Sequence, residues 1–494
     1  MDFLMHTIFK VQLISSLSCF FKRVANFIEL PTLLLLLLLS FCTTGRKDPA
    51  PTFMVADPGH FHAALVLKTM YEGVNPRVFV YAPDGPELAD FSNKVNGYRK
   101  RSESPATWQI SEFRGPGFFD KMISEKPGNV LILAGNNRNK TDYILKAIQN
   151  GINVFSDKPM AIDLKGFKQL ELAFREAKKR EVLLYDFMTE RFEISSILQK
   201  ELSQSPEVFG NLQTGTVEDP AVTKESVHHF FKFVSGTRLI RPPWFFDVEQ
   251  EGEGIVDVTT HLIDLVQWAC FPDQLIDYHT DITISSARHW TTGIALPQFR
   301  EVTGLSAYPD YLLTRVNSDS ILHIYSNGEI NYQIKGINTR VSVTWNYKAP
   351  EGGGDTHYSV MKGTKSRLEI RQGPEQKFKP ELYVIRASSD PDYEKGLERM
   401  IAGLASKYPG ISVEPFKNGY GASKNGYHIL IPDALRVGHE AHFAQVTQNY
   451  LKYLKNGTLP DWEVPNMLAK YWLTTMAREL TKRSNQADQP PTGF

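Results

Sequence analysis

Two segments of this sequence carry polar side chains that could do chemistry together. Lys158 stands between an acid and a proline in Asp157-Lys158-Pro159, directly after an apolar run. A lysine shielded from water can polarise a hydroxyl or carbonyl group, although a surface ion pair would give the same pattern. Asp257 and His261 are four residues apart, the spacing at which side chains meet on one face of a helix. An acid that orients a histidine makes it a general base with a pKa of about 6.5; the alternative is a half-buried histidine near a helix N-terminus.

The first strand-to-helix turn, 57–62, stands where a dinucleotide-binding loop belongs. At that point the N-terminus of the helix would hold a pyrophosphate. Only Gly59, the middle glycine of the G-x-G-x-x-G fingerprint, is present, and Asp57 and His62 occupy the other two glycine positions. Asp84 follows the second predicted strand, where an acid grips a ribose diol. An ordinary turn would explain each feature equally well.

Continuous apolar runs separated by helical stretches make up the N-terminal part of the chain. This alternation is typical of a parallel sheet covered by helices on both faces. Ligands bind at the carboxyl edge of such a sheet, so Lys158, at the end of a strand, is predicted to face the ligand crevice. The predicted strands are residues 53–56, 78–81, 129–134, 154–155 and 182–185.

The pattern changes after residue 190, where apolar and polar residues begin to alternate. Residues 341–347 alternate in this way, which predicts a strand with one face in water. Asn327-Gly328, between two such runs, predicts a tight hairpin turn. We therefore expect a largely antiparallel second sheet, followed by helices at 391–406, 438–455 and 465–483.

The first 42 residues predict an export signal. Basic residues precede a block of leucines, 33–39, that is too short for a membrane span of about 20 residues. Cys42 follows the block, as in a bacterial lipoprotein signal, although Phe41 stands where that signal prefers a small residue. A cleaved signal without lipid and an uncleaved anchor helix over 24–42 are the alternatives. All three place residues 43–494 on the periplasmic side of the membrane.

The composition excludes several classes of protein. The 494 residues include 55 Lys and Arg and 55 Asp and Glu, so the formal net charge is zero. A protein that binds nucleic acid usually carries a basic excess, so we predict no nucleic-acid partner. Only Cys19, Cys42 and Cys270 are present. Two of them lie in or beside the leader, so no disulfide framework is available.

Residues 52–375 resemble the Gfo/Idh/MocA oxidoreductases, a family named after glucose–fructose oxidoreductase and inositol dehydrogenase. The segment 157–159 is similar to the Glu-Lys-Pro motif of that family. Asp257 and His261 match its helical Asp…His pair, which a similar glycine-rich turn precedes. The segment 363–365, Gly-Thr-Lys, resembles its late sheet motif. The remaining C-terminal residues resemble an extra region found in some exported bacterial members.

The resemblance implies an α/β protein in which a Rossmann-like parallel sheet precedes an α/β domain with a large, open, mainly antiparallel sheet. It also implies NAD or NADP as cofactor, with NAD favoured. The implied parts are an export signal (1–42), a Rossmann dinucleotide-binding domain (43–190), a substrate-binding domain (191–375) and a C-terminal extension whose helices pack back on the body (376–494). The open sheet is also a candidate surface for a homo-oligomer.

The resemblance further implies which residues form the site. In the implied mechanism, Lys158 stabilises the alkoxide, Asp257 orients His261, and His261 takes the hydroxyl proton. No metal site is predicted: His439 and His442 are three residues apart, unlike the zincin motif, and a helix that lines the cleft explains them better. The implied cofactor-binding residues are Gly59, His60, Phe61, Asp84, Asn136, Asn137, Asp157, Lys158 and Trp244.

These observations lead to one main hypothesis and two alternatives. The main hypothesis is an NAD(P)-dependent oxidoreductase, anchored to the membrane by lipid, that acts on a secondary hydroxyl of a sugar or glycoside. Because the periplasm is not expected to hold free NAD, the cofactor would be tightly bound and recycled by a second substrate. The alternatives are an NAD-dependent glycoside hydrolase without net redox change and a non-catalytic sugar-binding lipoprotein. His228, His229 and His357 are further candidates to face a sugar, although the polar face of a strand explains them equally well.

Overall fold

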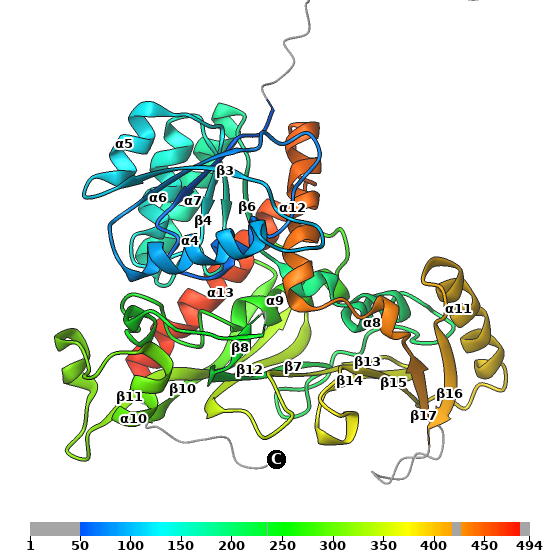
Figure 1. The fold of residues 1–494 in the computed structure, drawn as a ribbon. Helices are drawn as coiled ribbons and strands as arrows, with labels where there is room; N and C mark the ends of the chain where they lie inside the picture. Colours follow the sequence, from blue (N-terminus) through cyan, green and yellow to red (C-terminus); the bar gives the residue numbers. More distant parts are fainter. Residues whose placement is uncertain (1–49, 235, 417–425, 485–494) are drawn as a thin grey trace, which may run out of the picture. The chain divides into compact units, whose positions relative to one another are not determined.

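Two large β-sheets carry the fold, and both lie in the part of the chain that begins at Pro51 (Figure 1). The structure, a computed structural model, describes residues 50–234, 236–416 and 426–484. The predicted export signal, 1–42, lies outside the described residues. Among the residues that are described, no helix combines the length and the apolar character needed to cross a membrane.

The first sheet has six parallel strands in the order β3-β2-β1-β4-β5-β6. The winding reverses between β1 and β4, and ligands bind at the carboxyl ends of the strands on either side of such a point. Five of the strands confirm the prediction, whereas β3 was not predicted because this edge strand is mostly exposed and lacks an apolar run. The strands are β1 (Phe53–Ala56), β2 (Arg77–Ala82), β3 (Gln109–Arg114), β4 (Val130–Leu133), β5 (Asn153–Ser156) and β6 (Leu184–Asp186).

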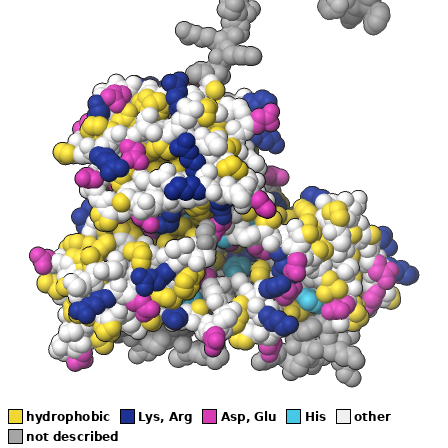
Figure 2. Space-filling view, in the orientation of Figure 1, with side chains coloured by type: hydrophobic (Ala, Val, Ile, Leu, Met, Phe, Trp, Pro, Cys, Tyr) yellow, Lys and Arg dark blue, Asp and Glu magenta, His cyan; other side chains and the backbone are white. Residues whose placement is uncertain are grey.

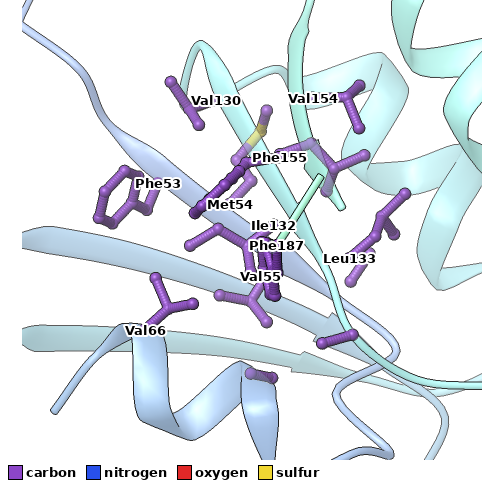
Figure 3. Close-up of a cluster of buried hydrophobic side chains, with 14 of the residues drawn as sticks. Phe53, Met54, Val55, Val66, Val130, Ile132, Leu133, Val154, Phe155 and Phe187 are labelled. Atoms are coloured by element: carbon purple, nitrogen blue, oxygen red, sulfur yellow. The ribbon is translucent and has the colours of Figure 1, made fainter. Parts of the chain in front are cut away.

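Apolar side chains of the central strands fill the core of this first sheet (Figure 3). Phe53, Met54 and Val55 of β1 and Ile132 of β4 are fully buried. A strand covered on both faces needs an apolar residue at every position, which is why these runs do not alternate. The helices that connect the strands are α3 (His62–Val66), α4 (Pro86–Arg99), α5 (Phe118–Glu125), α6 (Lys140–Gln149) and α7 (Leu164–Arg180).

The second sheet has nine strands in the order β10-β11-β12-β7-β13-β14-β15-β17-β16. Neighbouring strands are antiparallel except for β7 and β12, so the expected mainly antiparallel sheet is confirmed. Helices α8 (Ile194–Ser203), α9 (Thr259–Cys270), α10 (Leu296–Thr303) and α11 (Tyr393–Lys407) accompany it. The strands are β7 (Val222–Phe231), β10 (Ile282–Ala295), β11 (Ile321–Ile334), β12 (Ile337–Lys348), β13 (Thr356–Lys362), β14 (Ser366–Arg371), β15 (Glu381–Arg386), β16 (Ser412–Phe416) and β17 (Gly426–Leu430).

The predicted hairpin turn at Asn327-Gly328 is wrong, because both residues lie in the middle of β11. A Cβ on Gly328 would lie 2.6 Å from the Cβ of Ile255, so this glycine admits the segment that precedes α9. The Asn327 side chain donates to the carbonyl of Trp290 (3.0 Å) and accepts from the backbone N–H of Trp345 (2.6 Å). The Asn-Gly pair therefore serves a close approach between elements and not a turn.

The second sheet continues past residue 375, the boundary that the resemblance implies between the substrate-binding domain and the C-terminal extension. β14 lies before this position and β15 after it, and the two strands pair along their length. β17 and β16 then extend the sheet to its edge. β15, β17 and β16 thus complete the sheet.

The last two helices, α12 (His439–Asn456) and α13 (Glu463–Ser484), return to the first sheet (Figure 1). The Tyr450 ring of α12 stacks on Phe155 of β5, with ring centroids 4.5 Å apart. The Lys470 ammonium of α13 lies 2.8 Å from Asp186 at the end of β6 and 2.7 Å from Asp264 of α9. α13 therefore joins the two halves of the fold through buried charges.

Candidate active site

A cavity of about 1570 Å³ is lined by loops of both sheets and by the first turn of α12. Figure 2 shows a hollow in the molecular face with a histidine side chain inside it. Eight of the 13 histidines of the chain line the cavity, and this density of imidazoles is suited to proton transfer and to recognition of polar ligands. The eight are His60, His62, His228, His229, His261, His357, His439 and His442.

Lys158 and Asp257 form an ion pair at this cavity. Lys158 follows β5, Asp257 lies in the turn before α9, and both side chains are only 8% exposed. Burial alone would lower the pKa of the Lys158 amine, but the carboxylates of Asp257 and Asp157 outweigh burial and raise it above its usual value. Lys158 is therefore a fixed positive charge at neutral pH, suited to stabilising an alkoxide and not to accepting a proton.

His261 lines the same cavity as a neutral imidazole. Burial, together with the nearby Lys158 charge, lowers its pKa to about 4, below the value of about 6.5 expected for an unperturbed histidine. Its Nδ1 atom has no hydrogen-bond partner among the described residues. A neutral imidazole beside a fixed positive charge can accept the proton of a substrate hydroxyl.

The predicted contact between Asp257 and His261 is not formed. The helix α9 begins at Thr259, so Asp257 lies in the turn before it and not on the helical face that carries His261. The carboxylate of Asp257 accepts from Lys158 instead, and in the described part of the chain no hydrogen bond joins it to His261. The spacing argument failed because it assumed one continuous helix. Asp257 therefore positions the lysine.

The loop after β1 departs from a usual phosphate-binding loop in its charge. Asp57, at the first glycine position, has a φ of +48°, a left-handed conformation that glycine adopts more easily. Burial, with the Glu87 carboxylate nearby, raises the pKa of the Asp57 carboxyl to about 6. Above that pH a carboxylate occupies the loop that would have to face an anionic pyrophosphate.

Two glycines allow close approaches at this loop. A Cβ on Gly135 would lie 1.8 Å from the carbonyl oxygen of Asp57, so the loops after β1 and β4 are in contact. A Cβ on Gly59 would lie 3.2 Å from the indole of Trp244. Trp244 comes from the 3₁₀ helix η2 (Pro243–Phe246). The structure thus brings Trp244, from the second half of the chain, against the predicted cofactor loop.

The predicted cofactor-binding side chains on the other loops differ in their availability. The Asp84 side chain is 79% exposed, with Arg114 3.9 Å away, and is available to a ligand. The Asn136 amide donates to the Gln250 side chain (2.8 Å), and the Asn137 amide donates to the carbonyl of residue 251 (2.7 Å). The two asparagines therefore hold the loop after β4 against the segment before α9.

Of the predicted cofactor residues, His60, Phe61 and Lys158 line the cavity itself. The carboxylate of Asp157 lies behind this surface and is almost fully buried. It contacts the Nδ1 atoms of both His60 and His62. Asp157 thus fixes two imidazoles of the cavity wall.

A dinucleotide fits this arrangement, although Asp57 opposes its phosphates. The sheet has its change of winding between β1 and β4, and the Asp84 carboxylate can accept hydrogen bonds from a ribose diol. The loop at Gly59 would hold the pyrophosphate, and His60 and Lys158 would hold the nicotinamide end at the cavity. Because a carboxylate at position 84 repels a 2′-phosphate, these residues suit NAD better than NADP.

Three acids at the cavity escaped prediction from the sequence. Burial, together with the nearby Asp257 carboxylate, raises the pKa of the Glu251 carboxyl well above its usual value and so favours its protonated form. The Asp355 carboxylate lies 3.1 Å from His229 Nδ1, and Glu190 lies 3.3 Å from His439 Nδ1. None of these pairs has a diagnostic spacing along the chain. Only the glycine-rich turn around Glu251 marked a segment that the fold could bring close to a ligand.

Two family models match the chain. The model described as "Oxidoreductase family, NAD-binding Rossmann fold" matches residues 78–185. The model described as "Putative oxidoreductase C terminal domain" matches residues 198–482, more than half of the chain. The first match begins at β2, so it leaves out the unusual loop at Gly59.

Solved structures share the fold. The crystal structure titled as a "putative oxidoreductase" from Parabacteroides merdae is 50% identical, with a TM-score of 0.84 over 88% of this chain and 98% of that chain. Levoglucosan dehydrogenase in complex with NADH is 11% identical, with a TM-score of 0.56 over 88% and 97% of the two chains. GenD2 from gentamicin A biosynthesis, in complex with NAD, is 13% identical, with a TM-score of 0.53 over 90% and 97%. The last two show likeness of fold alone. A search of curated proteins gave no match.

Proposed function

The chain belongs to the Gfo/Idh/MocA family of oxidoreductases with an NAD-binding Rossmann domain, and from this premise we propose that it oxidises a secondary hydroxyl of a sugar or glycoside. The observation that carries the proposal is the combination at one cavity of a charged Lys158 and a neutral His261. Levoglucosan dehydrogenase, which is similar in fold, was crystallised with NADH and levoglucosan. This complex supports a sugar as the substrate class.

The proposed roles follow from charge and position. His261 accepts the proton of the substrate hydroxyl, because its imidazole is neutral above about pH 4. Lys158 stabilises the negative charge that develops on the same oxygen, and Asp257 holds the lysine at the cavity wall. The bound NAD supplies the acceptor for the hydrogen that leaves the carbon. Lys158 is buried and His261 is half-buried, so water screens these charges less than it would at the surface.

The first experiment asks whether the protein carries NAD. Native mass spectrometry of the purified protein should show NAD or NADH bound to each chain. Sugars and glycosides are then added one at a time, and reduction of the bound cofactor is followed by NADH absorbance. The matched control is the double variant Lys158→Met/Asp257→Leu, which should retain the cofactor and fail to reduce it. A protein that neither retains nor binds NAD or NADH would contradict the proposal.

A second function is favoured by Glu251. A redox-neutral glycoside hydrolase oxidises the sugar, eliminates the leaving group, adds water to the resulting double bond and then returns the hydrogen. It therefore needs an acid that protonates the leaving oxygen. Glu251 lines the cavity as a buried carboxyl group whose pKa burial raises well above its usual value. The test is release of the leaving alcohol from glycosides without net NADH, together with uptake of solvent deuterium beside the oxidised carbon. Glu251→Gln should abolish release but retain cofactor reduction, whereas net NADH without release would leave the dehydrogenase as the function.

We also propose that the chain is exported and lipidated at Cys42. The support is the leucine block at 33–39 followed by this cysteine. Cys42→Ser should abolish partitioning into detergent and change the mass of the mature N-terminus. Cleavage at another position, with Cys42 free of an acyl chain, would contradict this proposal.

A further inference from the structure

We propose that His60, His62 and Asp157 bind a divalent cation of the zinc class. One ring nitrogen of each histidine and a carboxylate oxygen of Asp157 lie within 4.8 Å of one another. Two imidazoles and one carboxylate are a ligand set that zinc uses where it keeps a further position open. The proposal goes beyond the oxidation proposed above. It shares His60 with the proposed nicotinamide site, but none of the three residues takes part in that proton transfer, and metal binding is measured without turnover.

The distances are close to those of a coordinated ion. His60 Nδ1 lies 2.7 Å from Asp157 Oδ2, and His62 Nδ1 lies 3.0 Å from the same oxygen. Ligand atoms at about 2.0–2.2 Å from a tetrahedral zinc ion are about 3.3 Å apart. Each imidazole nitrogen would therefore need to move only about half an ångström away from the Asp157 oxygen. A neutral imidazole can coordinate through Nδ1 when its proton is on Nε2.

The fold holds the three groups in place. The backbone N–H of His60 donates to the Ala134 carbonyl (3.0 Å), and the N–H of Asp157 donates to the Leu133 carbonyl (2.6 Å), so both segments are fixed against β4 and the loop that follows it. The buried Lys140 ammonium donates to the Asp157 carbonyl (3.1 Å). Backbone and neighbouring contacts of this kind orient metal ligands and reduce the entropy lost on binding.

The three proposed ligand side chains are largely buried, and the two histidines contact the cavity. The side chains of His62 and Asp157 are 8% and 2% exposed, whereas that of His60 is 15% exposed. Both histidines line the cavity, so a position left open on the ion can receive a ligand from it. The next imidazole is that of His439, whose ring centroid lies 6.0 Å from that of His62. An ion here would lie beside Lys158 and could polarise an oxygen of a ligand.

The alternative is that Asp157 only anchors two imidazoles by hydrogen bonds, and metal content separates the two cases. The purified protein is stripped with a chelator, dialysed against zinc, and analysed by plasma mass spectrometry and titration calorimetry. We expect one zinc ion per chain, and visible absorption bands when cobalt replaces zinc. Zinc should also raise the Tm of the stripped protein, because an ion that binds the folded state stabilises it.

Single variants locate the ion. His60→Gln and His62→Gln should each lower zinc affinity at least tenfold and remove the Tm increase. The matched control is His357→Gln, which changes a histidine of the same cavity carried by β13 and should retain both. Circular dichroism identifies the variants that fold. Wild-type protein that holds no stoichiometric zinc would overturn the proposal, and so would folded His60→Gln and His62→Gln variants that bind zinc like the control. Metal content is measured without turnover, so failure of the proposed oxidation leaves this result unchanged.

Discussion

The ammonium group of Lys158 and the carboxylate of Asp257 form a buried ion pair between residues 99 positions apart in the sequence. The pair joins the carboxyl end of β5 to the turn before α9, and so connects the cofactor sheet with the second half of the chain. Within the described residues, His261 Nδ1 has no hydrogen-bond partner. The proposed base is therefore kept neutral by its surroundings, through burial and a nearby positive charge, and is not oriented by a hydrogen-bonded acid.

Replacing both Lys158 and Asp257 should distinguish the effect of this ion pair on stability from its effect on the rate of catalysis. Lys158→Met alone leaves Asp257 buried and unpaired, which typically costs about 3–5 kcal/mol of the free energy of unfolding. Lys158→Met/Asp257→Leu removes both charges, and such replacements are often neutral or stabilising. We expect the double variant to unfold like the wild type in urea and to lose about 10²–10³-fold in kcat. A double variant within a factor of two of wild-type turnover would remove the lysine from the mechanism.

The pH–rate profile should place the acidic limb far below neutrality. The pKa of His261 is lowered to about 4 in the folded protein. The imidazole is then neutral above this pH, and the rate should fall as the pH drops through about 4, where protonation blocks the base. His261→Asn should be slower at every pH and should lack this limb, while it retains the cofactor. An acidic limb near pH 6.5, or the same limb in the variant, would assign the base to another group.

The sequence was sufficient to predict the first sheet because burial on both faces constrains every residue of a strand. The runs at 53–56 and 130–133 are apolar at every position, the run at 153–156 has Val154 and Phe155 at its centre, and helices separate them. The edge strand β3 faces solvent and carries no such constraint. The same limit explains the error at Asn327-Gly328, where an approach from a distant segment, and not a turn, requires the small residue.

The residue types of the site could be predicted from the sequence, but the pairs that its side chains form could not. Lys158, Asp257 and His261 do line one cavity. The pairing of Asp257 with Lys158 depends on where α9 begins, and helix ends are poorly determined by local sequence. The acids Glu190 and Asp355 reach the cavity only through contacts between distant elements.

Asp57→Asn should strengthen cofactor binding. The folded-state pKa of Asp57 is about 6 against a reference of 3.8, so the folded state binds this proton more tightly than the unfolded chain does. The stabilisation from the protonated carboxyl is complete below about pH 4 and is lost as the pH rises through 6. At pH 8 the variant removes a negative charge that repels the pyrophosphate. Its loss should improve the free energy of NADH binding by about 1 kcal/mol, which lowers the Kd roughly fivefold. Fluorescence titration at pH 8 and thermal melts at pH 4 and pH 8 measure both effects.

The control for that experiment is Asp84→Asn, which should act in the opposite direction. Asp84 is exposed and is proposed to accept hydrogen bonds from the ribose diol, so its loss should weaken NADH binding without changing thermal stability. If Asp57→Asn weakens binding as Asp84→Asn does, the Asp57 carboxylate contacts the cofactor favourably. Our account of the loop would then be wrong.

Lys470 offers a test of how α13 holds the two halves of the fold together. Its ammonium is fully buried, with Asp186 of the first sheet at 2.8 Å and Asp264 of α9 at 2.7 Å. Lys470→Met fits the same space but leaves two carboxylates without this cation, so we expect a loss of about 3–5 kcal/mol in the free energy of unfolding. Lys482→Met, at the exposed end of the same helix, should change it by less than about 0.5 kcal/mol. Urea unfolding of both variants gives the comparison. Equal free energies of unfolding would show that the buried charges do not stabilise the contact between α13 and the two halves of the fold. Lys470 does not line the cavity, so folded Lys470→Met protein should retain wild-type cofactor binding; loss of binding in protein that is still folded would mean that α13 also sets the relative position of the two sheets.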